Sequence, residues 1–316
     1  MENIRITINS EDLGMRLDRF LKEKQNMPFS LVQKLIRKKD IKINDSSTRH
    51  NYHLQAKDII SIKGHLPDNN TIKKQPEDQL YFGLLDTILK EIIFQDGYII
   101  AINKPYDIAV QGGSKILISI NDILKDLKYS FQEAPRLVHR IDRHTSGILL
   151  LARTKEIAQI LTQLFREQKI QKKYIALVRG IPDRKSGTLK MIIQKTIVED
   201  QEKMSESLDG KESITKFKVI KNVSKDIALV EFEPITGRTH QIRIHAAELL
   251  NCPILGDKKY GGENSIIKGL THKTKLHLAS QEVKIDDVKG RRYNITCPMP
   301  THMLKTIEEL EKSGIA

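Results

Sequence analysis

Residues 136–153 read RLVHRIDRHTSGILLLAR. In this stretch one carboxylate, Asp142, lies between two arginines, Arg140 and Arg143. A polar turn that ends on Gly147 follows, and then comes the apolar run 148–152. A short apolar run next to turn residues predicts a strand that is buried in a sheet. The sequence therefore predicts a charged side chain held at the rim of that sheet.

The position of Asp142 has two interpretations. A carboxylate fixed between cations beside a buried strand costs desolvation free energy, so it is unusual as a device for stability alone, which favours a functional role. The flanking arginines favour its ionised form, and an ionised carboxylate can act as a nucleophile or a base. An ordinary surface ion pair, which contributes little to stability, explains the local sequence about equally well.

The composition points towards a nucleic-acid partner. The 316 residues carry a formal charge of +13, with a pI near 9.5, and most of the surplus lies beyond residue 92. Lysines and arginines bind phosphates favourably because counterions are released. The alternative is a lysine-rich surface that only keeps the protein in solution.

The sequence predicts a cytoplasmic protein. The N-terminus has acidic residues and lacks the apolar segment of a secretory signal. No apolar run approaches the roughly 18 residues that a membrane span needs, so no membrane association is expected. Cys252 and Cys297 are far apart and each precedes a proline, which indicates a reducing compartment and no disulfide framework.

The chain divides into two domains by composition and length. Residues 1–66 predict a small α/β module with helices over 15–24 and 30–38, the second capped by Ser30, and strands at 41–43 and 59–62. A polar, breaker-rich stretch runs from Pro67 to Pro76, and we expect a linker over 67–91. Residues 92–316 form the second domain.

The second domain alternates short apolar runs with a few helical patterns. Thr154 is the expected cap of a helix, Thr239 is the expected cap of another over 240–250, and residues 303–313 predict a terminal amphipathic helix. Residues 188–215 are polar and charged, which is typical of a long hairpin or an insertion. Many strands and few helices predict an α+β fold with a mostly antiparallel mixed sheet.

Two further segments contain candidate functional residues. Residues 236–245 read TGRTHQIRIH; if they open a helix, its free N–H groups together with Arg238 and Arg243 favour an anion there. The alternative is an ordinary capped helix with a polar face. Tyr174 begins an apolar strand beside two lysines and could stack on an RNA base, although a plain strand aromatic is the better interpretation in isolation.

Other patterns predict neither a metal nor a cofactor. His139, Asp142 and Ser146 have the residue types of a hydrolytic triad but lack the nucleophile elbow. His240 and His245 are five residues apart, which does not fit two zinc ligands on one helix face. No phosphate-binding or dinucleotide-binding loop is present.

Several motifs together resemble the RluA-type RNA pseudouridine synthases. The similar segments, in the family's order, are INKPYDIAVQGG at 102–113, HRIDRHTSG at 139–147, KKYIALVRG at 172–180, TGRTHQIRIH at 236–245 and PILGDKKYGG at 253–262. The N-terminal module is similar to the α-L RNA-binding domain first described in a small-subunit ribosomal protein. The resemblance implies the pseudouridine synthase fold, isomerisation of uridine in RNA, and no cofactor.

The resemblance implies roles for particular residues. Asp142 matches the essential catalytic aspartate, and Arg243 matches the basic residue that pairs with it. Tyr174 matches the tyrosine that stacks on the uracil and is a candidate for removing the C5 proton. Arg140 matches the arginine that fills the gap left by the flipped base. The other expected RNA-contacting residues are His139, Arg143, Arg238, His240 and Gln241, and, in the N-terminal module, Arg16, Arg19, Lys34, Arg37 and Lys38.

The N-terminal module departs from its family at two turns. Lys39 and Lys57 stand where glycines are expected. A lysine in left-handed conformation costs roughly 1–2 kcal/mol, so the geometry of these turns is an open question.

The sequence thus predicts a monomeric enzyme that acts on 23S ribosomal RNA, or on a large-subunit assembly particle, and is closest to the RluC type. An RluD-like or tRNA-directed synthase is the first alternative. A catalytically inactive RNA-binding assembly factor is the second, and a hydrolase that uses Asp142 with a histidine is the third.

Overall fold

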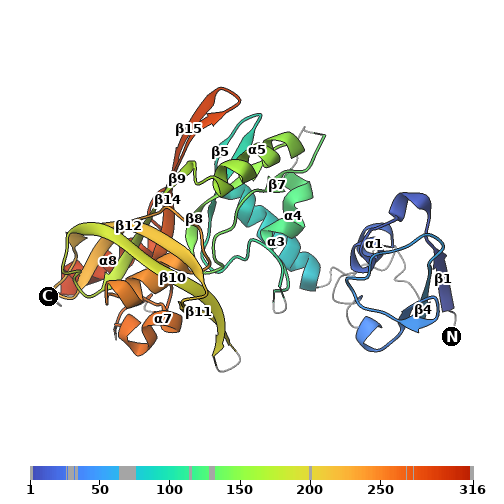
Figure 1. The fold of residues 1–316 in the computed structure, drawn as a ribbon, viewed down its shortest axis with the longest axis horizontal. Coiled ribbons are helices and arrows are strands. Elements are labelled where there is room, and N and C mark those ends of the chain that lie inside the picture. The colour runs from blue at the N-terminus through green and yellow to red at the C-terminus, as the bar shows by residue number, and fades with distance from the viewer. Residues whose placement is uncertain are drawn as a thin grey trace. The chain divides into compact units, whose positions relative to one another are not determined.

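The structure is a computed structural model that describes residues 3–25, 27, 32, 35–63, 76–113, 116–127, 132–198, 201–267, 269–272 and 274–313. The chain divides into two compact units, Met1–Gln75 and Pro76–Ala316, called the smaller and the larger unit below (Figure 1). Within the described residues, no helix is both long and apolar enough to cross a bilayer.

The smaller unit is a four-stranded sheet with a helix packed on it. The strands run in the order β1 (Asn3–Thr7), β4 (Ile59–Lys63), β2 (Ile41–Ile43) and β3 (Ser46–Ser47). Helix α1 (Leu17–Lys24) buries Leu17, Phe20 and Leu21 against this sheet. The predicted strands β2 and β4 are confirmed, whereas β1 was not expected from the sequence. Ser30, the expected helix cap, lies outside the described residues.

The two lysines that stand where glycines were expected have a left-handed backbone conformation. Lys39 has φ 60° and Lys57 has φ 69°. Each ends a turn directly before a strand, β2 after Lys39 and β4 after Lys57. A glycine would adopt this conformation without strain, whereas the lysine side chains strain the backbone at both turns.

Replacing either lysine with glycine should stabilise the smaller unit. We expect Lys39→Gly and Lys57→Gly each to add about 1 kcal/mol, because glycine removes a left-handed strain of roughly 1–2 kcal/mol at a smaller entropic cost. Native-state hydrogen exchange of the β4 amides measures this change. Lys42→Gly in β2 is the matched control and should slow no exchange. Equal effects of all three substitutions would contradict the strain argument.

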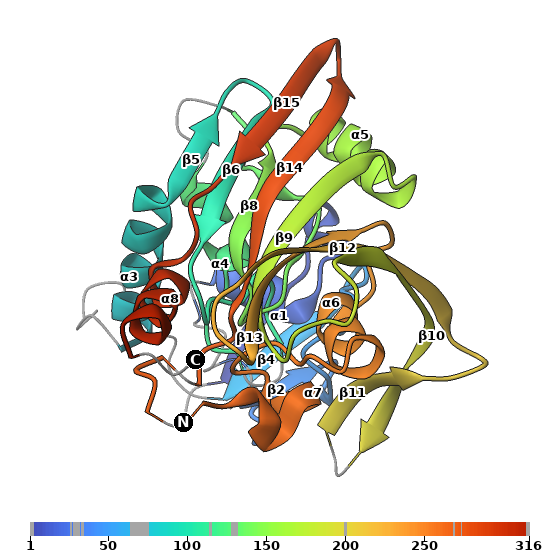
Figure 2. The same ribbon diagram turned by 90° about the vertical axis from the view of Figure 1, so that its left-hand side faces the viewer.

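The larger unit is built on an eleven-stranded sheet. Its main path is β11 (Gln201–Glu206), β10 (Ser186–Val198), β12 (Lys211–Asn222), β13 (Ile227–Pro234), β9 (Ile170–Arg179), β14 (Leu278–Val288), β8 (Ser146–Ala152), β6 (Ile99–Lys104) and β5 (Ile92–Gln95), with β7 (Arg136–Leu137) on β8 and β15 (Arg291–Thr296) on β14. All pairs are antiparallel except β14 with β8. Figure 2 shows this sheet with helices beside it. The predicted α+β class is confirmed.

Helix α3 (Pro76–Lys90) occupies most of the segment 67–91 that the sequence assigned to a linker. Its side chains Leu84 and Ile88 are buried in a core of the larger unit. The linker interpretation is therefore wrong for residues 76–90, since Pro76, expected within the linker, begins a helix. The stretch 64–75 lies outside the described residues.

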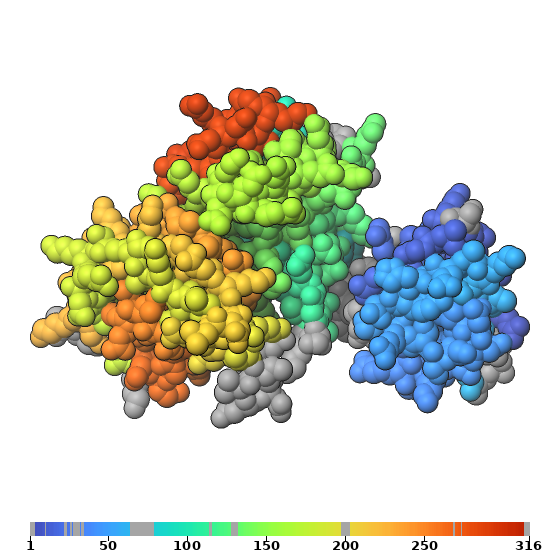
Figure 3. All heavy atoms as spheres, in the orientation of Figure 1, coloured from blue at the N-terminus to red at the C-terminus, as the bar shows by residue number. Residues whose placement is uncertain are grey.

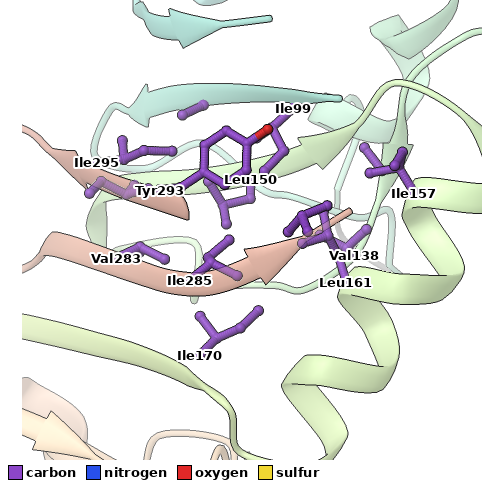
Figure 4. Close-up of a cluster of buried hydrophobic side chains, with 14 of the residues drawn as sticks. Ile99, Val138, Leu150, Ile157, Leu161, Ile170, Val283, Ile285, Tyr293 and Ile295 are labelled. Atoms are coloured by element: carbon purple, nitrogen blue, oxygen red, sulfur yellow. The ribbon is translucent and has the colours of Figure 1, made fainter. Parts of the chain in front are cut away.

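Strand β8, which follows the Asp142 turn, is buried on both faces, as its apolar sequence predicts. Ile148 and Leu150 face a core that contains Ile157 and Leu161 of α5 (Lys155–Arg166) (Figure 4). The alternate residues Leu149 and Leu151 face the core of α3 and α4 (Ile120–Ile123). Strand β8, which follows the Asp142 turn, therefore packs between two hydrophobic cores.

Three predicted elements of the larger unit are confirmed and one cap is corrected. Thr154 caps α5 by accepting a hydrogen bond from the Ile157 amide, β10 and β11 form the long hairpin, and α8 (Thr301–Ser313) is the terminal helix. The helix expected over 240–250 is shorter: α6 (Gln241–Ile244) continues as a π-helical turn, His245–Leu249. Its cap is His240 with φ 55°, in place of Thr239.

Candidate active site

Asp142 lies in the turn between β7 and β8, where buried groups fix the backbone. The Thr145 amide donates to the Asp142 carbonyl oxygen over 3.0 Å. Gly147 closes the turn with φ +97°, and a Cβ there would lie 2.1 Å from the Ser280 carbonyl oxygen of β14. Only glycine therefore lets β14 approach β8 at this point.

Lys104, at the end of β6, is hydrogen-bonded to the same turn. Its ammonium group is fully buried and donates to the carbonyl oxygens of Pro105, Ile108 and Arg143 at 2.8, 2.9 and 3.0 Å. Burial lowers the pKa of Lys104 to about 7. Arg143 directly follows Asp142, so this lysine ties the Asp142 turn to the end of β6.

Asp142 opens into a pocket of about 470 Å³, called the Asp142 pocket. Helix α5, light green on the viewer's face of the larger unit in Figure 3, contributes Phe165 and Arg166 to its wall. Eight residues singled out from the sequence line this pocket: His139, Arg140, Asp142, Tyr174, Arg238, His240, Gln241 and Arg243. Segments that lie far apart in the chain thus meet around one carboxylate.

The Asp142 carboxylate is recessed, with 23% of its side chain exposed. Its Oδ2 atom lies 3.9 Å from Nη1 of Arg243 and 3.8 Å from Nε2 of His240. Burial raises the pKa of Asp142, while the charges of Arg243 and Arg140 oppose that rise. Arg140 therefore favours the ionised form, as the sequence predicts, but burial, which the sequence does not show, has the larger effect.

Arg243 is held mainly by a second carboxylate. Its Nε and Nη2 atoms donate to both oxygens of Asp257 at 2.8 and 2.7 Å, and both side chains are buried. This paired geometry fixes the plane of the guanidinium. The remaining nitrogen, Nη1, is the one that faces Asp142.

Tyr174 lines the pocket from β9, where it lies opposite Phe232 and Ser280 of the neighbouring strands. Burial raises the pKa of Tyr174 to about 12; the charge of Asp142 adds to the rise, and a hydrogen bond with Ser280 opposes it. The side chain is therefore a neutral phenol at neutral pH.

Three of the expected RNA-contacting residues have partners within the protein. His139 accepts the Leu150 amide on Nε2 at 2.8 Å and stacks on Phe165, and burial lowers its pKa to about 3. The Gln241 amide donates to Ile214 and Thr215 and accepts from Arg238 and Thr236, so it shapes the TGRTHQ turn. Arg143 pairs with Asp107 at 2.7 Å, away from the pocket lining.

The remaining expected RNA-contacting residues, those of the N-terminal module, belong to the smaller unit. Arg16 is bound to Asp18 through two hydrogen bonds of 3.1 and 2.6 Å. Arg19, Arg37 and Lys38 have exposed side chains, and Lys34 lies outside the described residues.

Five pocket or support residues were not predicted to have a role. Asp257 and Tyr260 belong to the PILGDKKYGG motif, and Lys104 belongs to the INKP motif, but only their motifs were recognised. Arg166 and Lys172 add positive charge to the pocket wall. Burial lowers the pKa of Lys172, while Glu233 opposes that change. A cationic wall around one recessed carboxylate suits an anionic polymer whose reacting group enters the pocket.

When the single-turnover rate is plotted against pH, its fall on the acid side should follow the protonation of Asp142. Arg140→Gln removes a positive charge that lowers the pKa of this buried carboxyl group. We therefore expect the acid limb of the single-turnover rate, plotted against pH, to move to higher pH. Arg143→Gln is the matched control with a smaller expected shift, because Asp107 binds its guanidinium. A shift to lower pH in Arg140→Gln would contradict this electrostatic assignment.

Comparison with known proteins identifies the family. The model of the RNA pseudouridylate synthase family matches residues 98–248. The ribosomal large subunit pseudouridine synthase C of Rickettsia prowazekii is 35% identical, over 93% of this chain and 97% of that protein. Its counterpart from Rickettsia bellii is 34% identical, over 94% and 98%. The structure of human RNA Pseudouridylate Synthase Domain Containing 4 is 26% identical, with a TM-score of 0.62, over 73% of this chain and 97% of that one. The chain therefore belongs to the RNA pseudouridylate synthase family, and within it to the RluC-like members.

Proposed function

We propose that this chain isomerises specific uridines of large-subunit (23S) ribosomal RNA to pseudouridine, with Asp142 as its catalytic group. The observation that carries the proposal is the meeting of Asp142, Tyr174 and Arg243 in one cationic pocket. The names of the Rickettsia relatives support ribosomal RNA as the target. The substrate is either the free RNA or an assembling large subunit.

The chemistry requires bond rearrangement within one nucleotide. The bond between N1 and C1′ of uridine breaks, the uracil turns, and C5 bonds to C1′. The proton on C5 leaves and N1 gains one, so the atoms balance without an oxidant or a reductant. Asp142 fits two roles in this sequence: attack on C1′, or removal of a ribose proton that leads to a glycal intermediate.

The target base must leave its stack to reach Asp142. Base flipping costs a few kcal/mol and is cheapest in loops and distorted helices. Arg140 has an exposed side chain at the edge of the pocket, where its guanidinium can stack in the place that the base leaves. Arg243 faces the carboxylate with a charge that Asp257 holds in place.

Tyr174 supplies a ring for stacking on the extruded uracil. Its raised pKa, about 12, favours the stacking role over removal of the C5 proton, because the phenol stays protonated at neutral pH. Tyr174→Phe keeps the ring and should keep most of the activity. A complete loss in Tyr174→Phe would show that the hydroxyl takes part in the chemistry.

The smaller unit is proposed to be an α-L RNA-binding domain. Its compact core and its exposed Arg37 and Lys38 support this role. A chain that begins at Pro76 should keep the fold of the larger unit, because that unit contains its own cores, and should bind ribosomal RNA more weakly. An unchanged RNA affinity would contradict an RNA-binding role of the smaller unit.

Tritium release from ribosomal RNA labelled at uridine C5 tests the activity directly. Isomerisation replaces the C5 hydrogen, so tritium should appear in water, and mapping of the product identifies the modified positions. Transfer RNA labelled in the same way is the comparison substrate. Release from transfer RNA alone would contradict the ribosomal target, and binding without release would indicate an inactive assembly factor.

A further inference from the structure

His240 is hydrogen-bonded on one side of its ring and faces the Asp142 carboxylate on the other. The Met204 amide of β11 donates to the Tyr260 hydroxyl oxygen at 3.0 Å. The same oxygen lies 2.8 Å from Nδ1 of His240. On the other side of the imidazole, Nε2 of His240 lies 3.8 Å from Oδ2 of Asp142. One ring therefore connects the β10–β11 hairpin with the reacting group.

Counting protons along these contacts favours one tautomer of His240. A phenol oxygen that accepts the Met204 amide still has its own O–H to donate, and the nearest acceptor is Nδ1 of His240. The single proton of a neutral imidazole then lies on Nε2, on the side of Asp142. The opposite tautomer would turn an Nε2 lone pair towards a carboxylate oxygen, which is repulsive.

The neutral state of the ring has its own physical cause. Burial lowers the pKa of His240 to about 3, and the charges of Arg243 and Lys259 add to this effect, while Asp257 opposes it. Arg243 also lies over the face of Tyr260, 5.1 Å from the ring centroid. Asp142 thus faces one charged donor on Arg243 and one uncharged donor on His240.

Both donors approach the same carboxylate oxygen. Nη1 of Arg243 and Nε2 of His240 lie 3.9 and 3.8 Å from Oδ2 of Asp142. These distances are longer than hydrogen bonds, and catalytic contacts often shorten only when substrate fills the pocket. Two donors on Oδ2 would leave Oδ1 for the ribose.

We propose that His240 is a positioning residue that orients Asp142 through a neutral Nε2–H, and that Tyr260 sets this tautomer. The proposal rests on the isomerase function proposed above and adds two residues to it. His240 orients the carboxylate without adding positive charge, so the basicity of Asp142 is preserved. Tyr260 acts through His240.

A competing explanation for the histidine is its backbone. His240 caps α6 in left-handed conformation, with φ 55° and ψ 17°. Asn tolerates this conformation well and Gln less so. Asn, however, places its amide near the position of Nδ1, whereas the longer Gln can place an N–H near the position of Nε2. The two substitutions therefore separate the backbone role from the donor role.

Three variants test the donor role under single-turnover conditions with labelled ribosomal RNA. We expect His240→Ala and His240→Asn to lower the rate about ten- to hundredfold, and His240→Gln to recover much of it. The RNA affinity of all three variants should stay near that of the wild type. A rate for His240→Asn that equals or exceeds that of His240→Gln would overturn the proposal, because the backbone would then explain the histidine.

Ring nitrogen chemical shifts of histidine-labelled full-length protein test the tautomer without any activity. We expect a protonated Nε2 and an unprotonated Nδ1 for His240, and a change of this pattern in Tyr260→Phe. His245 is the internal control, since its Nε2 contacts Ser213 and not Tyr260. A proton found on Nδ1 of wild-type His240 would overturn the proposal.

The two measurements also separate failure of this proposal from failure of the proposed function. A wild-type chain that releases no tritium from either RNA would contradict the isomerase function. The nitrogen shifts would still decide where the His240 proton lies. An active wild type with the wrong tautomer would contradict the positioning role alone.

Discussion

Asp142→Asn is expected to abolish tritium release while RNA affinity stays near that of the wild type. The amide has the shape of the carboxylate but is neither a nucleophile nor a base of comparable strength. The cationic wall, which includes Arg140, Arg166 and Lys172, stays in place to bind phosphates. Tritium release by Asp142→Asn at a measurable fraction of the wild-type rate would contradict the proposed mechanism.

The same substitution should make the protein more stable at neutral pH. The pKa of Asp142 is raised in the folded state, so its ionisation costs stability as the pH rises above the unfolded value. Asparagine removes this cost. The difference in unfolding midpoint between wild type and variant should therefore shrink towards zero at a pH below the ordinary aspartate pKa. A variant that is less stable than the wild type at pH 7 would contradict the burial argument.

Arg243→Met should lose activity and stability together. Removing the guanidinium takes the charged donor away from Asp142, and loss of one such donor costs about 10²–10³ in rate. It also leaves Asp257 buried without its cation, and breaking a buried pair in this way costs about 3–5 kcal/mol. Single-turnover rates and denaturant unfolding measure the two effects separately.

A second substitution distinguishes the two losses. Asp257→Asn combined with Arg243→Met removes the unpaired charge, so the double variant should regain part of the stability but none of the activity. Arg238→Met is the matched control, because the Arg238 side chain is exposed and donates to the Glu212 carbonyl oxygen. A near-normal rate in Arg243→Met with a large loss in Arg238→Met would show that the sequence led to the wrong arginine.

Features that depend on local sequence patterns were predicted correctly. The apolar run after Asp142 fixed the position of β8, and the polar stretch at 188–215 fixed the long hairpin. The resemblance to the pseudouridine synthases implied that Asp142, Tyr174 and Arg243 would meet, and they line one pocket.

The partners of these residues could not be predicted, because pairing depends on how distant segments pack. Nothing in the TGRTHQIRIH segment indicates that Asp257 binds Arg243, or that Tyr260 binds His240. The net rise in the pKa of Asp142 was missed for the same reason, since burial is a property of the folded pocket. The cap of α6 was assigned to Thr239 because a left-handed histidine has no marker in the sequence.

The two-sided burial of β8 couples the Asp142 turn to the whole larger unit. Amides in such a strand exchange with solvent only when the surrounding cores open together. The turn that presents Asp142 is hydrogen-bonded at Thr145 and anchored by Lys104, directly before this strand. Heat inactivation of the enzyme should therefore coincide with cooperative unfolding, without an earlier step in which the Asp142 turn unfolds alone.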